Sequence, residues 1–260
     1  MTRCCFAIVL AAVLLLTGCE RQQSEEFKPQ LMLHCMLLAG TPDLAVSVNR
    51  TYRIDEPFDT AFPGANAVVW RGQDTWQLAC QHHDYYYRRL DSGQAIAPHD
   101  TFHIRVAKEG FDTVYGRTVV PDTFTILYPA WNETVTLTDS MGWTRSRGAR
   151  GYYMSLERRQ GNQDFFLDVA IPNDSFGPEY DSTRVNIQQM LFLYGGGHSQ
   201  QLTVYAADSN YYDWVSGGGF GAGGGGGRAS HLVGGVGVFG SGCVRSVDVY
   251  YQPDTSRPRH

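Results

Sequence analysis

The chain has 260 residues and is mildly acidic, with 21 Lys and Arg against 26 Asp and Glu. It therefore lacks the clustered excess of basic residues that binding to nucleic acid requires. Hydrophobic residues make up 43% of the sequence, which is enough for a buried core and excludes a mainly disordered chain. The length allows one large domain or two small ones.

The N-terminus has the pattern of a secretory signal. Arg3 precedes an apolar run over residues 6–16, which is too short to cross a bilayer core as a helix. The run ends in Leu-Thr-Gly-Cys at 16–19, which resembles the lipobox of bacterial lipoproteins. The resemblance implies cleavage before Cys19 and acyl chains on its thiol as the membrane anchor. An ordinary signal peptide followed by a chance cysteine is the alternative.

Loss of residues 1–18 would leave 242 of the 260 residues and remove only Arg3 among the charged residues, so the net charge would fall from −5 to about −6. Glu20 follows the cysteine, where an Asp would favour retention in the inner membrane of some bacteria. We therefore expect the outer membrane. Residues 19–29 are predicted to be a polar tether and residues 253–260 a flexible tail.

From residue 30 onward apolar and polar residues alternate, as in half-buried strands. Turn residues separate the runs at intervals of roughly ten residues, which is typical of all-β sandwiches. We predict an all-β fold of two antiparallel sandwich-like units, over 30–122 and 123–252, divided near Pro121. The main runs are 31–37, 44–48, 67–70, 76–78, 102–106, 114–120, 134–138, 152–156, 165–169, 185–187, 201–206 and 243–251.

One short helix is predicted. Asp208 and Ser209 can cap the N-terminus of residues 210–215, and Ser216-Gly217 can end the helix. Two turns are marginally stable alone, so the helix needs packing of Tyr211 or Trp214 against the body.

The second unit resembles fibronectin type III-like domains. Trp143, Ser146, Gly-Ala at 148–149 and Gly-Tyr at 151–152 have the spacing of that family's second and third strands. The resemblance implies that Trp143 packs in the core and that a turn of small residues leads into a strand bearing a tyrosine.

The order of several blocks resembles the DUF4249-type bacterial lipoproteins, whose genes often lie near those of TonB-dependent outer-membrane receptors. The blocks are the lipobox, Gly-Ala-Asn-Ala-Val-Val at 64–69, a Tyr-rich strand, Asp-Ser-Asn-Tyr-Tyr at 208–212 and Gly-Gly-Val-Gly-Val-Phe-Gly at 234–240. The chain departs from the family in its length and in the glycine run at 217–227. The resemblance implies a receptor as partner and supplies no catalytic residues.

Two segments, 219–224 and 235–240, satisfy the G-x-G-x-x-G pattern. A dinucleotide site needs this pattern between a strand and a helix, whereas residues 243–251 alternate like a strand. We therefore expect a flexible Gly-rich loop at 216–227, then a Gly-rich strand or bulge in close contact with another backbone, and no nucleotide cofactor.

Four histidines, His82, His83, His99 and His103, lie close together in the sequence. Adjacent side chains of a strand point to opposite faces, and the sequence has no H-E-x-x-H or H-x-H pattern. We therefore expect no metal site. No G-x-S-x-G motif is present either, and we expect no enzyme activity and no cofactor.

Three cysteines remain after the lipidated one: Cys35, Cys80 and Cys243. One disulfide with a free thiol and three buried thiols are both compatible with this number.

Aromatic clusters supply the binding candidates, because Tyr and Arg are enriched at recognition surfaces. In alternating strands one tyrosine of each pair belongs to the core, so only part of each cluster can bind a ligand. The candidates are Tyr85, Tyr86, Tyr87, Arg88, Tyr211, Tyr212 and Trp214.

These features predict a lipid-anchored outer-membrane protein that acts as a non-catalytic binding or accessory module. Its partner would be a surface ligand or an outer-membrane β-barrel receptor. A surface adhesin or structural envelope protein is the alternative, and a metal-dependent hydrolase that uses the histidines of 82–103 is less favoured.

Overall fold

The computed structural model describes residues 27–53, 55–57, 61–91, 93–136, 139–160, 163–172, 182–186, 198–217 and 230–252. Within these ranges, side chains are not described for 156–160, 163–172, 182–186 and 198. The predictions for the signal segment, Cys19, the glycine run and the tail fall outside the described residues and stay predictions.

The regular elements of the described residues are β-strands and one short helix, which confirms the predicted fold class. The first strands are β1 (Leu31–Leu38), β2 (Asp43–Arg50), β3 (Asn66–Arg71), β4 (Asp74–His82), β5 (Tyr85–Arg89), β6 (Thr101–Ala107) and β7 (Val114–Val119). The later elements are β8 (Ile126–Tyr128), β9 (Glu133–Val135), β10 (Ser140–Thr144), β11 (Gly151–Gln160), β12 (Gln163–Pro172), β13 (Ser182–Asn186), β14 (His198–Ala207), α3 (Ser209–Ser216) and β15 (Val236–Tyr251).

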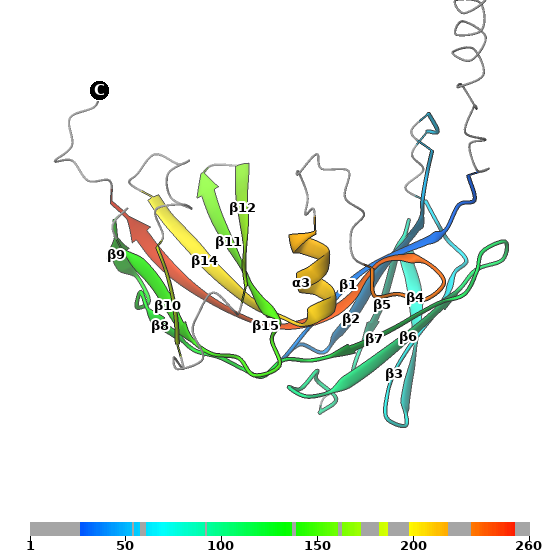
Figure 1. The fold of residues 1–260 in the computed structure, drawn as a ribbon, viewed down its shortest axis with the longest axis horizontal. Helices are drawn as coiled ribbons and strands as arrows, with labels where there is room; N and C mark the ends of the chain where they lie inside the picture. The colour runs from blue at the N-terminus through cyan, green and yellow to red at the C-terminus, as the bar shows by residue number, and fades with distance from the viewer. Residues whose placement is uncertain are drawn as a thin grey trace, which may run out of the picture.

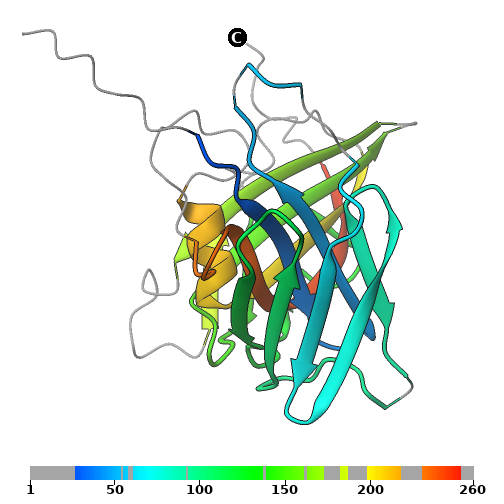
Figure 2. The ribbon, with the colours of Figure 1, turned by 90° about the vertical axis from the view of Figure 1, so that its right-hand side faces the viewer.

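The first unit is a sheet that folds around its own core (Figure 2). In β1 every second residue is buried, as its alternating sequence predicts, and Leu31, Leu33 and Leu37 join the first hydrophobic cluster. The strand order β1-β2-β5-β4-β3-β6-β7 leads around this cluster. An antiparallel bridge joins Tyr115 of β7 to Val233, which lies just before β15. Because β15 pairs with β1, the strand order returns to the strand at which it began.

The second unit is a sandwich of two sheets. Strands β12-β11-β14-β15 form one layer and β13-β10-β8 the other. Trp143 on β10 is fully buried, and its ring meets that of Tyr152 on β11 edge to face with centroids 5.3 Å apart. The hydroxyl oxygen of Tyr152 accepts a hydrogen bond from the Ser146 amide at 2.7 Å, so this tyrosine ties the turn between β10 and β11 to the core.

One long strand, β15, belongs to both units (Figure 1). Its first half pairs in parallel with β1, and its second half pairs antiparallel with β14 and in parallel with β9. The buried residues form two clusters, which meet in sequence between Val120 and Phe124, but Phe239 of β15 belongs to the first cluster. The two parallel pairings depart from a purely antiparallel arrangement, because β15 joins both units in one continuous sheet and runs in the same direction as β1 and β9, which come much earlier in the chain.

Glycines allow β15 to approach β1 and β7. Gly237 has φ +109°, and a Cβ atom there would overlap the carbonyl oxygen of Leu33. The Gly-rich segment is therefore a strand in close backbone contact, as predicted.

The helix α3 extends one residue beyond the predicted 210–215 at each end, and its caps are among the residues expected. The Asp208 carboxylate accepts a hydrogen bond from the Tyr211 amide at 2.9 Å and caps the N-terminus, and Gly217 is the C-cap. The helix lies on the concave side of the long sheet, above β15 (Figure 1). Across the described residues, none of the helices has the length and apolar character needed to cross a membrane.

Candidate functional site

The long sheet curves beneath α3 (Figure 1). A cavity, here called the concave site, lies on this side of the sheet. The cavity has a volume of about 420 Å³. Its floor consists of side chains that point away from the two cores, from β1, β11, β14 and β15, and Tyr211 of α3 adds a wall. The lining residues are Met36, Leu38, Tyr153, Ser155, Gln201, Thr203, Tyr205, Tyr211, Val244 and Ser246.

None of these lining residues is charged. The rings of Tyr153 and Tyr205 pack at 5.6 Å between centroids and present aromatic surface from neighbouring strands. Two hydroxyls and an amide lie beside these rings. The Thr203 and Ser246 hydroxyls share a hydrogen bond of 2.9 Å, and the Gln201 amide donates a hydrogen bond to the Asp248 carboxylate at 3.1 Å. The site therefore offers apolar ring faces with neutral donors and acceptors at their edge.

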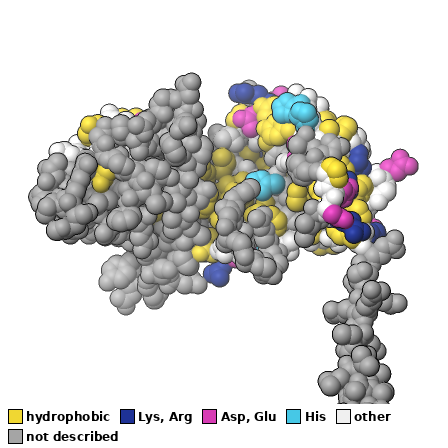
Figure 3. Space-filling view, turned by 90° about the horizontal axis from the view of Figure 1, so that it is seen from above, with side chains coloured by type: hydrophobic (Ala, Val, Ile, Leu, Met, Phe, Trp, Pro, Cys, Tyr) yellow, Lys and Arg dark blue, Asp and Glu magenta, His cyan; other side chains and the backbone are white. Residues whose placement is uncertain are grey.

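Seen from above, hydrophobic side chains gather in the middle of the described surface, and charged ones lie mostly around them (Figure 3). A site of this kind suits an uncharged ligand that has both apolar surface and hydroxyl or amide groups. Among the described lining residues none carries a charge that would neutralise an ionic ligand, and the nearby Asp248 carboxylate already accepts a hydrogen bond from Gln201.

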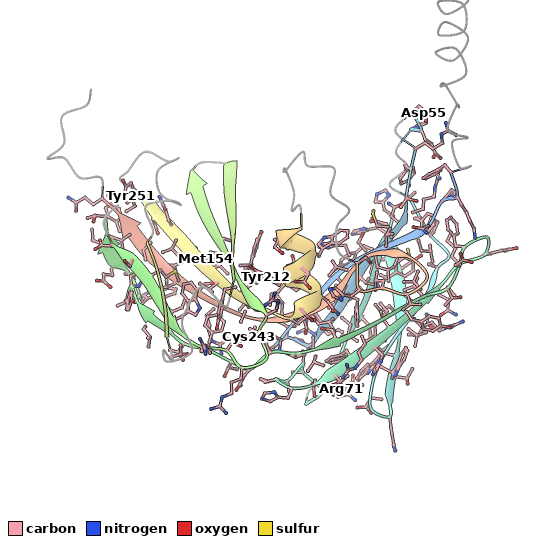
Figure 4. The ribbon with its side chains drawn as sticks, in the orientation of Figure 1. Asp55, Arg71, Met154, Tyr212, Cys243 and Tyr251 are labelled. Carbon is pink, nitrogen blue, oxygen red and sulfur yellow. The ribbon has the colours of Figure 1, made fainter. Side chains whose placement is uncertain are left out.

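Of the predicted binding residues on α3, only Tyr211 lines this site. Tyr212 and Trp214 are 7% and 8% exposed, so they hold the helix against the body. Figure 4 labels Tyr212 on α3 and Met154 on β11, one of the buried residues of the second core. This packing stabilises a helix that is too short to persist alone.

The predicted residues of β5 lie elsewhere, since β2 and β1 separate β5 from β15. Tyr86 is 1% exposed and its hydroxyl donates to the Phe62 carbonyl, so it is a core residue. Tyr85 and Tyr87 face outward with their rings stacked at 6.2 Å, and Arg88 is exposed. The structure does not bring the β5 cluster into the concave site.

Sequence reasoning missed most of the concave site. Tyr153 and Tyr205 are the outward members of strands whose alternate residues, such as Tyr152 and Val204, are buried. That alternation marks each residue as outward-facing. It does not reveal that β11, β14 and β15 present these residues side by side.

The four histidines do not converge. His82 stacks on Tyr85 at 5.7 Å, and His103 stacks on Trp70 at 5.2 Å on a different strand. His99 has φ +69° in the turn before β6. In the part of the chain that the structure describes, no three His, Cys, Asp or Glu side chains are placed to hold a metal ion.

The three remaining cysteines are free. Cys35 lies in the first core and Cys243 in the second, and burial raises the pKa of both thiols. Cys80 is exposed on β4. Neither possibility left open by the sequence therefore holds, since these cysteines form no disulfide and one of them is not buried.

A buried polar cluster joins the two units at the foot of α3. Thr118 of β7 donates to the Asp208 carboxylate at 2.6 Å, and its oxygen lies 2.6 Å from the Ser241 hydroxyl. Because Thr118 has a single hydroxyl proton, Ser241 is the donor to Thr118. Burial raises the pKa of Asp208, and the hydrogen bonds from Thr118 and Tyr211 oppose this shift in part.

The raised pKa of Asp208 makes stability depend on pH. A carboxyl whose pKa is higher in the folded state stabilises the fold fully below its unfolded pKa, and this contribution declines as pH rises to the folded value. Asp208→Asn keeps an acceptor for Tyr211 and can donate to Thr118, so we expect its stability relative to the natural chain to increase as pH rises from about 4, the pKa of an unfolded aspartate, to the raised pKa of folded Asp208. Urea unfolding of both proteins measures the difference, and a difference that is constant or opposite in slope contradicts the assignment.

No family model matches the chain, and no curated protein is similar to it. Solved structures with some likeness include fibronectin(III)-like modules of Clostridium thermocellum CbhA (8% identity, 89% of this chain and 98% of that chain, TM-score 0.26). Others are three N-terminal domains of the Highly Immunogenic Outer Capsid protein of bacteriophage RB49 (8% identity, 87% and 71%, TM-score 0.24) and DIP-gamma IG1+IG2 (6% identity, 87% and 98%, TM-score 0.21). Likenesses at these TM-scores carry no argument about function, and the DUF4249-type resemblance stays a prediction.

Proposed function

We propose that this chain is a non-catalytic binding module, held at the outer membrane by lipid on Cys19, which binds a neutral ligand in the concave site beneath α3. The observation that carries the proposal is a cavity of about 420 Å³ whose described lining residues combine three tyrosines with hydroxyl and amide groups and carry no charge. Ligand sites commonly combine apolar surface with a few polar groups that fix orientation.

The site is also built on rigid elements. Its floor belongs to paired strands with long, regular registers, and α3 is held by the buried Tyr212 and by its Asp208 cap. A preformed site loses little conformational entropy when a ligand binds. This property suits capture or presentation of a ligand.

The anchor and the accessory role rest on the lipobox and on the DUF4249-type resemblance. Labelled palmitate should enter the chain in a bacterial host, and Cys19→Ala should abolish the label and release the protein from the membrane fraction. Affinity purification from detergent-solubilised membranes should recover an outer-membrane β-barrel. If no β-barrel protein is recovered, the role as a receptor accessory is excluded, whereas the proposal of ligand binding is unaffected.

Ligand binding can be tested with uncharged probes that offer both kinds of surface. We expect neutral maltohexaose, cellohexaose or a capped Gly-Ser-Thr-Ser-Gly peptide to shift the backbone amide signals of Thr203 and Ser246 in nuclear magnetic resonance spectra. The acidic hexagalacturonate should not, because none of the described lining residues is cationic. If none of the neutral probes binds at millimolar concentration, or if signals move only elsewhere, the proposed site is wrong.

Tyr205→Ala is the decisive variant, because it removes one ring of the Tyr153–Tyr205 pair. We expect at least a tenfold loss of affinity for the bound probe, which corresponds to about 1.4 kcal/mol. Tyr85→Ala is the matched control, since Tyr85 is an outward tyrosine on β5 and does not line the site. Equal losses in the two variants, or a loss in Tyr85→Ala alone, would contradict the site and favour the β5 cluster.

A further inference from the structure

The outer edge of β7 has backbone groups available for another strand. On one side β7 pairs with β6, and on the other Tyr115 alone pairs with Val233. Backbone groups of successive residues in a strand point to alternate edges, so Arg117 and Val119 face the same edge as Tyr115. In the described ranges no backbone group pairs with either residue on that edge.

One of these edge groups is capped by a side chain. The Asn210 amide of α3 donates to the Arg117 carbonyl at 2.6 Å, as the N–H of a neighbouring strand would. Among the described residues, none pairs with the amide of Arg117 or with either backbone group of Val119. The Val119 side chain is 39% exposed beside them.

A cavity of about 370 Å³ lies along this edge. Residues 117–119 of β7 form one side, and residues 148–150 and 208–210 form the others. An added strand would lie about 4.8 Å from β7, so it would occupy this space. This cavity lies at the junction of the two units and shares no lining residue with the concave site.

The charges around the edge favour an acidic partner. Arg117 and Arg150 line the cavity, where the Arg150 guanidinium lies 3.9 Å from the Asp213 carboxylate, and Arg105 lies opposite Tyr115 on β6. Within the described part of the chain, Arg105 and Arg117 form no ion pair. The one acidic residue of the lining, Asp208, is 5% exposed and accepts hydrogen bonds from Thr118 and Tyr211.

We propose that the edge of β7 is a second binding site, at which an extended acidic peptide segment of a partner protein adds as a strand. The peptide backbone pairs with the Arg117 N–H and with both backbone groups of Val119, while Asn210 keeps the Arg117 carbonyl, and the peptide carboxylates face the arginines. Strand addition of this kind obtains affinity from backbone hydrogen bonds and specificity from side chains at alternate positions. This site is independent of the neutral-ligand site and goes beyond the proposed function.

The probe is the capped peptide Gly-Thr-Glu-Val-Glu-Thr-Gly, with a counterpart in which Lys replaces both Glu residues. We expect the acidic peptide to bind, with amide signals of Arg117 and Val119 shifting in nuclear magnetic resonance spectra, and the lysine peptide to bind at least tenfold more weakly. Methylation of alternate peptide nitrogens should abolish binding, because it removes the donors of one peptide edge.

Val119→Pro is the sharpest protein variant, since it removes an N–H that points away from β6, and proline is tolerated on strand edges. We expect it to weaken acidic-peptide binding at least tenfold, while Val119→Thr, which keeps the N–H, binds as the natural chain does. Arg117→Glu changes only an exposed side chain and should weaken acidic-peptide binding by a similar factor. This variant therefore tests the proposal even if the proline variant fails to fold.

Equal binding of the two peptides, or unchanged binding by Arg117→Glu, would overturn the acidic-peptide assignment. A dimer of the natural chain that Val119→Pro converts to a monomer in analytical ultracentrifugation would also overturn it, because the occupant of the edge would then be a second copy of this chain.

Discussion

Gly237→Ala is expected to lower the free energy of unfolding by about 3 kcal/mol or more. Two effects add at this position. The backbone has φ +109°, which side-chain-bearing residues rarely adopt, and the new Cβ would overlap the Leu33 carbonyl oxygen. Because Leu33 and Gly237 are directly paired between β1 and β15, the strands must separate to admit the methyl group.

Gly40→Ala is the matched control, because Gly40 has φ +84° and no atom within 4 Å of an added Cβ. Its cost should be only that of the backbone conformation, about 1–2 kcal/mol. Urea or guanidinium unfolding followed by circular dichroism measures both variants. Equal losses of unfolding free energy in the two variants would show that the close approach of β15 to β1 adds nothing to the effect of the backbone conformation at Gly237.

Trp143→Ala is expected to destabilise the protein by about 3–5 kcal/mol. Trp143 is fully buried in the second core, where its ring packs against Tyr152 at 5.3 Å. Removing it leaves a cavity between the two sheets and deprives Tyr152 of its aromatic neighbour. Thermal and denaturant unfolding both report this loss.

Trp131→Ala separates the effect of burial from that of losing a tryptophan. Trp131 belongs to the same unit and is 64% exposed. We expect a change within about 0.5 kcal/mol, as for exposed substitutions generally. A large loss from Trp131→Ala, or a small one from Trp143→Ala, would contradict the assignment of the second core.

Much of the local structure follows from the sequence. Alternation in β1 predicts which of its residues are buried, because side chains of a strand point to opposite faces in turn. Asp208 and Gly217 end α3 where expected, since caps satisfy backbone groups of the first and last turns. The same alternation correctly predicts that only part of each tyrosine cluster lies outside the core.

Other features depend on pairings between distant segments. Residues 236–251 read as a Gly-rich segment followed by an alternating strand, yet they form one strand that serves both units. Whether these residues form one strand or two segments depends on β1 and β14, which pair with β15 on its opposite sides and are not adjacent to it in the sequence. Cys80 likewise resembles a core residue by type and is exposed.

The mildly acidic composition, the alternating strands, the lipobox-like Leu-Thr-Gly-Cys pattern and the helix caps are properties of the sequence itself, because they depend on residue type and on spacing over a few positions. Only the tertiary structure places Tyr153, Tyr205 and Tyr211 around one cavity whose described lining is uncharged, and leaves Val119 of β7 without a backbone partner on its outer edge among the described residues. The physical reason is that strand order and register are set by packing and hydrogen bonds between segments that local patterns do not connect.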